Sequence, residues 1–146
     1  PMAALLANDD LNVVEDKALG HYTHEKSSVG CAAALATIDC LMEDGLLDNA
    51  VTLGNSGLQQ LEALKQKHSI IHEVRGLGLF YGIDLRADGK PASNEADAIL
   101  YHSLSNGLSY KVGGGSILTL CPPLTINNDE LTQAFNIIEN GINSLN

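Results

Sequence analysis

The sequence predicts a mixed fold of the α/β class, with an α+β arrangement in its second part. Two observations carry this prediction. The 146 residues are 45% hydrophobic and 18% charged, which is enough apolar material for an ordinary core. The spacing of apolar residues also changes along the chain, from helical periods to short strand-like runs and back, with Gly and Pro between them.

The first part of the chain predicts one short strand and two helices. Residues 2–7 form an apolar run before the polar NDD, as in a buried strand that ends in a turn. From Ser28 to about Asp44 the residues are apolar on nearly every side of a helix, which is typical of a helix in an interior or an interface. Residues 46–68 place leucines at helical spacing and predict an amphipathic helix.

A glycine-containing stretch in the middle of the chain predicts one long strand. It is IIHEVRGLGLFYGIDLRADGK, residues 70–90, and the turn residues ADGKP close it. Within it, RGLGLFYG superficially resembles a dinucleotide-binding fingerprint. Gly76 and Gly78 do not follow a strand and open a helix, which is the context that such a fingerprint requires. A glycine-rich strand against which another backbone packs closely is therefore the favoured interpretation.

The last part of the chain predicts two helices on either side of a strand. Residues 94–106 predict a helix that is capped by Ser93 or Asn94. The glycines of VGGGS predict a flexible loop, although a Gly-rich backbone can also let a ligand approach, and SILTLCPPLTI predicts a strand that its two prolines halt. Residues 127–145 predict a closing helix with acidic residues in its first turn.

Composition and charge exclude several function classes. The net charge of −10 and the pI near 4.6 argue against a nucleic acid or an anionic membrane as partner, because both normally require a basic face. No apolar run reaches the roughly 20 residues of a membrane span. Cys31, Cys40 and Cys121 each lie in an apolar context and are predicted to be core residues. A cytoplasmic protein with reduced cysteines fits these observations.

Histidine and carboxylate residues provide only weak candidates for metal ligands. His21, His24 and Glu25 are of the types that zinc accepts, but nothing completes a ligand set. His68 and His72 have i, i+4 spacing, and they straddle the point where a helix is predicted to give way to a strand. We therefore predict no metal site and interpret these side chains as solvated.

The polar stretch before the first helix is the strongest functional candidate that the residues alone provide. GHYTHEKSS, residues 20–28, places a Thr hydroxyl shortly before the free backbone N–H groups of a helix start. A hydroxyl and several N–H donors together suit an anion such as phosphate. Thr23 is therefore a candidate phosphate ligand, with a plain polar loop as the alternative.

Three motifs, GHYTHEKSSVGCAAALATIDCL, HSIIHEVRGLGLFYGIDL and ILTLCPPLTINNDEL, resemble in order and spacing the C-terminal part of the class III pyridoxal-phosphate aminotransferases. The resemblance covers nearly the whole chain. It implies the C-terminal portion of a fold-type I PLP-dependent transferase, with pyridoxal 5′-phosphate as cofactor and a homodimer as assembly. In this family a Thr five positions before a usual Pro contacts the cofactor phosphate of the neighbouring subunit. Thr23 matches that Thr, although Ser28 stands where the Pro usually is.

The resemblance also implies a domain organisation. Residues 1–44 correspond to the end of the large cofactor-binding domain, and residues 45–146 to a small C-terminal α/β domain. The helix near Val29 then lies close to the dimer interface. In the family the Schiff-base Lys lies a few residues upstream of a strand like residues 2–7, so we expect a piece of a longer enzyme that carries no catalytic residue and is inactive alone. The remaining lysines that we considered are interpreted as solvated charges: Lys17, Lys26 and Lys111.

One position of the family's substrate site differs in this sequence. Many members carry an Arg two residues before the position of Cys121, where it binds the substrate α-carboxylate, and this sequence has Thr119 there. A Thr hydroxyl supplies one neutral donor in place of the charged fork of an Arg. We therefore expect α-amino acids to bind poorly at this point, unless Arg75 or an Arg from elsewhere in the protein binds the carboxylate.

These residues leave three function classes open. The resemblance favours an aminotransferase that moves an amino group from a small-molecule primary amine to a keto acid. The first alternative is a lyase of the same family that acts on a phosphorylated or phosphonate amino compound, and Thr119 adds weight to it. The second alternative is a binding or structural module that belongs to no enzyme. Neither a nucleic acid nor a membrane is expected as a partner.

Overall fold

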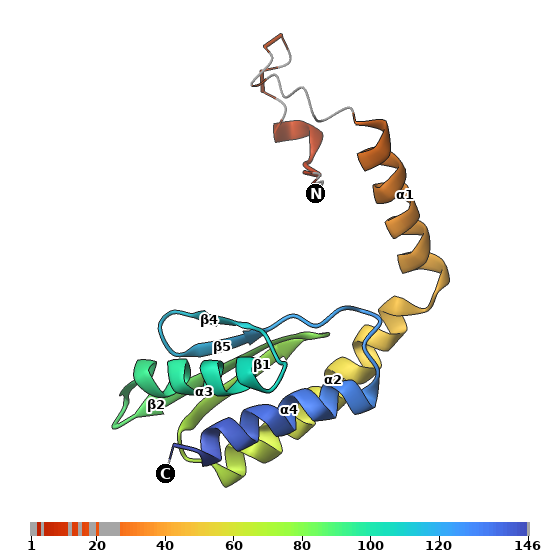
Figure 1. Cartoon of the computed structure of the whole chain (residues 1–146). Helices are drawn as coiled ribbons and strands as arrows, with labels where there is room; N and C mark the ends of the chain where they lie inside the picture. The colour runs from red at the N-terminus through yellow and green to blue at the C-terminus, as the bar shows by residue number, and fades with distance from the viewer. Residues whose placement is uncertain are drawn as a thin grey trace. The chain divides into compact units, whose positions relative to one another are not determined.

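The computed structural model describes residues 3, 5–11, 13–14, 16–17, 20 and 27–145. By its internal contacts the chain divides into two compact units, Pro1–Gly45 and Leu46–Asn146 (Figure 1). The assignment of residues 1–44 and 45–146 to a large and a small domain stays a prediction.

The first unit contains one long helix, α1 (Ser28–Glu43), and a short 3-10 turn at Asp9–Leu11. The Ser27 side chain caps α1 by accepting a hydrogen bond from the backbone N–H of Gly30, and the left-handed Gly45 follows its end. The helix predicted from Ser28 is therefore confirmed.

The strand predicted at residues 2–7 is wrong for the part of it that the structure describes. Ala3 and Leu5–Ala7 are not in a strand, and Leu5 and Leu6 are exposed. A strand needs a hydrogen-bonded neighbour, and none of the described strands pairs with these residues. An apolar run alone does not supply that neighbour.

The second unit contains an antiparallel sheet. Its strands are β1 (Ile71–Leu77), β2 (Phe80–Ala87), β3 (Lys90–Pro91), β4 (Lys111–Gly113) and β5 (Ile117–Leu120). The order across the sheet is β1-β2-β5-β4, and β3 pairs with the far end of β2. All neighbours run antiparallel, so hairpin turns connect β1 to β2 and β4 to β5.

The single long strand predicted over residues 70–90 is instead a hairpin. The chain reverses between Leu77 and Phe80, where Gly78 has a φ of +54° that favours glycine. A Cβ at Gly54 would lie 2.6 Å from the backbone of Gly78, so the two backbones can approach this closely only with a glycine at position 54. The close backbone packing predicted for this stretch is therefore confirmed, but the reversal is not visible in its alternation. The turn predicted at ADGKP does form, between β2 and β3.

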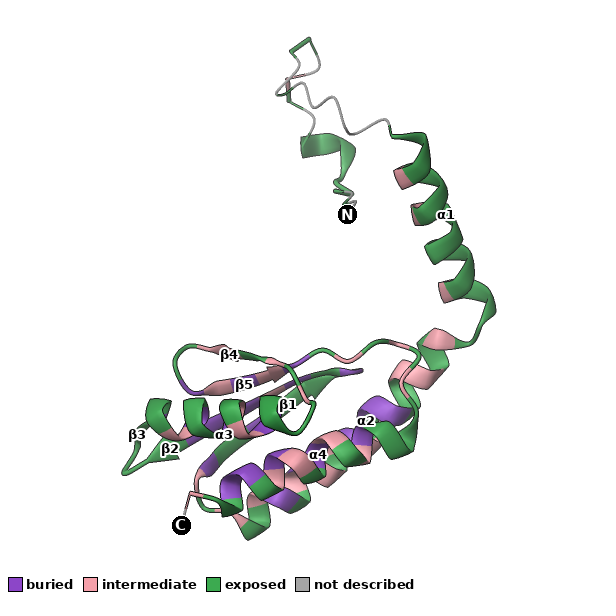
Figure 2. Ribbon diagram, in the orientation of Figure 1, coloured by how far each residue is buried: buried purple, intermediate pink, exposed green. Residues whose placement is uncertain are grey.

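Three helices cover one face of the sheet: α2 (Leu46–Lys67), α3 (Ser93–Ser105) and α4 (Asn128–Asn143). Figure 2 shows buried residues where these helices meet the strands. Tyr81 lies at the centre, where its ring packs edge-on against Phe135 with centroids 5.8 Å apart and its hydroxyl donates to the carbonyl of Leu53. The core side chains of the strands are Ile71, Val74, Tyr81, Ile83, Leu85, Leu118 and Leu120.

A β-bulge in β1 places an odd-numbered and an even-numbered residue on the same, core-facing side of the sheet. Ile71 pairs with Leu85 and Glu73 pairs with Asp84, so His72 is one extra residue in β1. Ile71 and Val74 are both buried for this reason, although strict alternation would place them on opposite faces.

The helices predicted in this unit are confirmed with small changes at their ends. No side chain caps α3, whose N-cap is Ala92, so the predicted cap at Ser93 or Asn94 is wrong. At α4, Asn127 and Glu130 form a reciprocal capping box. The loop predicted at VGGGS is shorter than expected, because Gly113 ends β4 and only the residues after it turn.

The cysteines are exposed, which corrects the prediction that they are core residues. Cys31 and Cys40 lie on α1, which has no buried residue, and Cys121 follows β5. An apolar neighbourhood in sequence does not decide which way a side chain faces. In the described part of the chain, no helix combines the length and the hydropathy that crossing a bilayer requires.

Candidate functional site

The face of the sheet that the helices leave open carries a row of residues from four strands. Thr119 pairs with Lys111 on one side and with Gly82 on the other, and Gly82 pairs with Arg75. Directly opposed residues of antiparallel strands project to the same face. The register therefore aligns Lys111, Thr119, Gly82 and Arg75 across the sheet.

A groove of about 480 Å³ lies over this row. Glycines form much of its lining, and a glycine leaves room for a ligand to approach the backbone. Among its described lining residues, Arg75 carries the only full charge at neutral pH. The complete lining is Arg75, Gly76, Leu77, Phe80, Tyr81, Gly82, Gly113, Gly114, Ile117 and Thr119.

Arg75 lies across Gly82 toward the middle of the groove. A Cβ at Gly82 would meet the Cγ and the Nε of Arg75 at 3.6 Å, so the absence of a side chain at Gly82 provides the surface over which Arg75 lies. The Nη1 of Arg75 donates to Oε2 of Glu73 at 3.2 Å, and both side chains are about half exposed. A guanidinium has five N–H donors, so this single contact leaves most of them for another acceptor.

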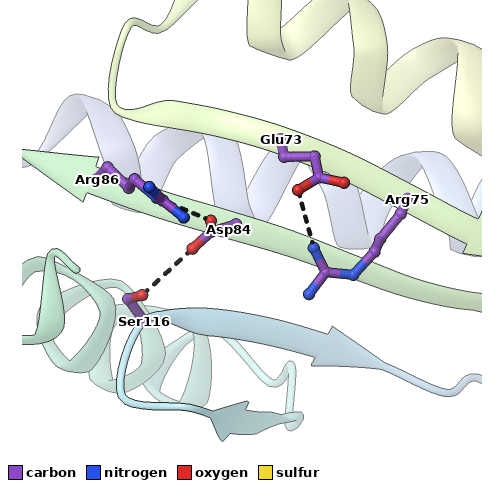
Figure 3. Close-up of polar contacts among 5 residues, drawn as sticks. All are labelled: Glu73, Arg75, Asp84, Arg86 and Ser116. Atoms are coloured by element: carbon purple, nitrogen blue, oxygen red, sulfur yellow. Dashed lines mark hydrogen bonds and ion pairs between the residues drawn. The ribbon is translucent and has the colours of Figure 1, made fainter. Parts of the chain in front are cut away.

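A second ion pair neutralises the buried carboxylate of this face (Figure 3). Asp84 is 7% exposed; Arg86 Nε donates to its Oδ2 at 3.1 Å, and Ser116 Oγ donates to its Oδ1 at 3.3 Å. The carboxylate therefore has a cation and a hydroxyl as partners and does not repel an anion at full strength. Arg86 is engaged beside Asp84 and does not line the groove.

The structure brings together two of the three site residues that the sequence predicts. Arg75 and Thr119 line the same groove, with Gly82 between them. The Thr119 hydroxyl makes a long contact of 3.5 Å to the carbonyl of Ile117 and can turn to another partner. Thr23 lies outside the described residues.

Sequence reasoning allowed that the glycines of VGGGS admit a ligand, but it missed Gly82 in the floor of the groove and the alignment of Lys111 with Thr119. The signal for both was the strand pairing, because the short segment KVG forms an additional strand and so positions Lys111 opposite Thr119. A three-residue strand beside a run of glycines leaves too little alternation to recognise.

No metal cluster is found in the part of the chain that the structure describes. His68 follows α2, where its Nε2 lies 3.3 Å from Oε1 of Glu139, and His72 lies in the bulge of β1. The two histidines therefore do not share a helix face, because a helix and a strand separate them. His21, His24 and Glu25 lie outside the described residues.

None of the lysines in the described part of the chain lies in an enclosed site. A lysine that bonds covalently to this cofactor must lie in an enclosed site. The described lysines are Lys17, Lys65, Lys67, Lys90 and Lys111, and none of them is buried. We therefore derive no step of a reaction through the cofactor from this part of the chain.

Residues 1–142 match the family model described as Aminotransferase class-III. The chain belongs to the class III aminotransferase family. It is 40% identical over 145 residues to (R)-1-hydroxy-2-aminoethylphosphonate ammonia-lyase from Vibrio splendidus. The matching stretch covers 97% of this chain and 30% of that protein. The chain thus spans about a third of the length of this relative.

Solved structures of the same family share the fold. A phospholyase from Arthrobacter in complex with phosphoethanolamine matches with a TM-score of 0.77 and 27% identity, over 81% of this chain and 29% of that one. A PLP-bound amine transaminase from an uncultivated Pseudomonas species matches with a TM-score of 0.78 and 30% identity, over 86% of this chain and 30% of that one. The predicted family and the α/β fold class of the fold-type I enzymes are confirmed, and the PLP-bound form agrees with the predicted cofactor.

Proposed function

We propose that the whole protein is a PLP-dependent lyase that eliminates ammonia from a small amino compound with a phosphonate or phosphate head group. Thr119 in the row of the groove carries this proposal, because it replaces the charged fork that would select an α-carboxylate. The 40% identity to an ammonia-lyase named for an aminoethylphosphonate supports it independently. The sequence favoured an aminotransferase, and the lyase was its alternative.

The groove supplies what the anionic head of such a substrate needs. Arg75 offers charged N–H donors over Gly82, and the Thr119 hydroxyl stands beside it in the same row. Three oxygens of a phosphonate can accept from both groups at once, whereas a planar carboxylate has only two oxygens. Arg75 and Thr119 are therefore the proposed substrate-binding residues. The cofactor would supply the electron sink for the loss of a proton from the carbon that bears the amino group.

Amino transfer from a primary amine to a keto acid is the second candidate. The name of the matching family and the match to an amine transaminase favour it. The two reactions differ in what they require, because amino transfer consumes a keto acid and releases no ammonia, whereas elimination needs no second substrate. A single assay can therefore separate them.

The experiment measures ammonia release and keto acid consumption by the whole enzyme. The substrates are 1-hydroxy-2-aminoethylphosphonate, phosphoethanolamine and ordinary α-amino acids, each with and without pyruvate. We expect ammonia from a phosphonate or phosphate substrate without pyruvate. A kcat/KM of about 10⁴ M⁻¹s⁻¹ or more on an α-amino acid, unimproved by Thr119→Arg, would overturn the role given to Thr119.

The role of Thr23 in holding the cofactor phosphate is also a proposal, as are the homodimer and the cytoplasmic location. Removing a hydrogen bond to a charged group costs about 1.5–3 kcal/mol, so Thr23→Ala should weaken cofactor affinity in the whole enzyme by roughly ten- to a hundredfold. Thr23→Ser keeps the hydroxyl and should retain most of the affinity. Equal affinity for all three proteins, measured by equilibrium dialysis of the cofactor, would rule the role out.

A further inference from the structure

We propose that Lys111 is a specificity-determining residue that selects a dianionic head group over a carboxylate. It does so as the second cation of a cradle whose first cation is Arg75. The inference rests on the proposed function, since it concerns the same groove, and it assigns a role to a lysine that the sequence alone describes as a solvated charge. The observations are the strand register, the charges of the open face and the space over Gly82.

The register places the two cations at opposite ends of one row. Lys111 lies on β4, Arg75 on β1, and the two positions between them are Thr119 and Gly82. Neighbouring strands are about 4.8 Å apart, so the two Cα atoms are separated by about 14 Å. Lys and Arg have long, flexible side chains, and both can extend inward over the short residues between them. An anion above Thr119 then lies within reach of both.

The acidic residues of this face leave the row with positive charge. Asp84 is held by Arg86 and Ser116, and Glu73 contacts one nitrogen of Arg75. In the described part of the chain, Lys111 forms no ion pair. Lys111 is exposed and lies outside the residues that line the groove, so its side chain must extend inward along the row to reach a ligand.

A second cation favours a dianion more than a monoanion. Coulomb attraction is proportional to the product of the charges, so the interaction with Lys111 is about twice as large for a phosphonate dianion as for a carboxylate at the same distance. Arg75 alone can satisfy the two oxygens of a carboxylate in a bidentate pair. The third oxygen of a phosphonate is the one that Lys111 would reach from the β4 side.

The small residues around Thr119 keep the centre of the cradle free. A Cβ at Gly113 would lie 3.5 Å from the Thr119 hydroxyl, and a Cβ at Gly82 would touch Arg75. Larger side chains at these positions would enter the space in which the head group must lie. A long side chain in place of Thr119 would stand between the two cations, so Thr119 is also the choice that keeps the cradle open.

The experiment compares two ligands of equal spacing, 2-aminoethylphosphonate and β-alanine, on the whole PLP-loaded enzyme. Dissociation constants come from the change in cofactor absorbance on titration, and no turnover is needed. Lys111→Met removes the charge from an exposed position on an edge strand. Lys90→Met is the matched control, because Lys90 is also exposed and lies on a strand of the same sheet, opposite Ala87 and away from the groove.

We expect Lys111→Met to weaken binding of 2-aminoethylphosphonate about fivefold, the effect of an exposed charge pair, and binding of β-alanine only about twofold. Lys111→Glu should weaken phosphonate binding further, by roughly twenty-fivefold, and Lys90→Met should change neither ligand. Unchanged phosphonate affinity in Lys111→Met, or an equal loss for both ligands, would overturn the inference while the proposed function stands. A wild-type enzyme that binds the cofactor but neither amine would overturn both.

Discussion

The two faces of the sheet follow different rules, although the same strands make both. The face under the helices is filled by aliphatic side chains around Tyr81, and almost all of them are buried. The open face carries glycines, ion pairs and the Arg75 to Lys111 row, and Leu77 and Phe80 stand exposed beside its groove. One face is therefore built for packing, and the other is built to leave space and to present charge.

This difference teaches where stability and specificity are encoded. Side chains at alternate positions of β2 serve opposite purposes: Tyr81 and Ile83 anchor the core, whereas Gly82 between them forms the floor of the groove. A substitution on β2 should therefore change stability where the side chain faces the core, and ligand affinity where the side chain faces the groove. Matched pairs of variants on the two faces test this directly.

The largest expected effect comes from a pair of isoleucines on opposite faces. Ile83 is fully buried, and Ile117 is half-buried on the open face, next to Asp84 in the register. Ile83→Ala should lower the free energy of unfolding by about 2–5 kcal/mol, since it leaves a cavity in the core. Ile117→Ala should cost about 1 kcal/mol or less. Urea denaturation of the two variants measures both, and equal losses would refute the division between the faces.

A pair of glycines gives the next largest effect. A Cβ at Gly57 on α2 would lie 2.3 Å from the Tyr81 hydroxyl, whereas a Cβ at Gly82 would meet its neighbours at an ordinary 3.6 Å. Gly57→Ala should destabilise the fold by about 1–3 kcal/mol, because Tyr81 must move. Gly82→Ala should leave the melting temperature nearly unchanged and weaken binding of 2-aminoethylphosphonate in the whole enzyme. Scanning calorimetry and ligand titration distinguish the two outcomes, and a large loss of stability in Gly82→Ala would contradict the open groove.

The covered face was easier to predict from the sequence than the open one, for a physical reason. Burial imposes period and hydrophobicity, so α2 and α4 could be located from spacing and caps. The reversal at Gly78 was hidden, because a glycine in an alternating run is compatible with both a bulge and a turn. The groove depends on which residues pair across strands, and pairing is set by tertiary contacts that alternation does not specify.

Within the candidate site, residue type could be predicted but not proximity. Thr119 was recognised from its position in a motif, and Arg75 was considered only as a substitute cation. Their shared groove required the pairing of β1 and β5 on either side of β2. For the cysteines, the apolar context in the sequence suggested burial, but all three are exposed. At the exposed Cys40, hydrogen bonding to Asp44 raises the pKa of the thiol.

Two arginines of the open face sharpen the comparison at a smaller scale. Arg75 lines the groove, whereas Arg86 is the partner of the buried Asp84. Arg75→Met should weaken binding of 2-aminoethylphosphonate by roughly ten- to thirtyfold with little change in stability, since it removes charge-assisted donors. Arg86→Met should destabilise the fold by about 1–2 kcal/mol, because Asp84 keeps only Ser116, and should weaken binding less than Arg75→Met does, through the uncompensated charge of Asp84. The reverse assignment of affinity and stability would exclude Arg75 from the site.

The smallest effect concerns two glutamates and pH. Glu139 of α4 accepts from His68 and from Lys67 in the helical layer, and the His68 hydrogen bond holds the pKa of Glu139 below its ordinary value. Because the pKa of Glu139 is lower in the folded protein than in the unfolded chain, its ionised carboxylate stabilises the fold at pH values above the ordinary glutamate pKa. This stability is lost as the pH falls through the lowered pKa. Glu73 has only the exposed pair with Arg75.

Glu139→Gln should therefore lower the free energy of unfolding by about 0.5–1 kcal/mol at pH 7, and the difference from wild type should shrink as the pH falls through the lowered pKa of Glu139, where the wild-type carboxylate becomes protonated. Glu73→Gln, its control on the open face, should change stability by no more than a few tenths of a kcal/mol at either pH, because an exposed ion pair is screened by solvent. Urea denaturation of the three proteins at pH 7, 5 and 3 provides the measurement. A loss in Glu139→Gln that persists at pH 3 would mean that shape and not charge holds α4 to the end of α2, and the helical layer would then owe its stability to packing alone.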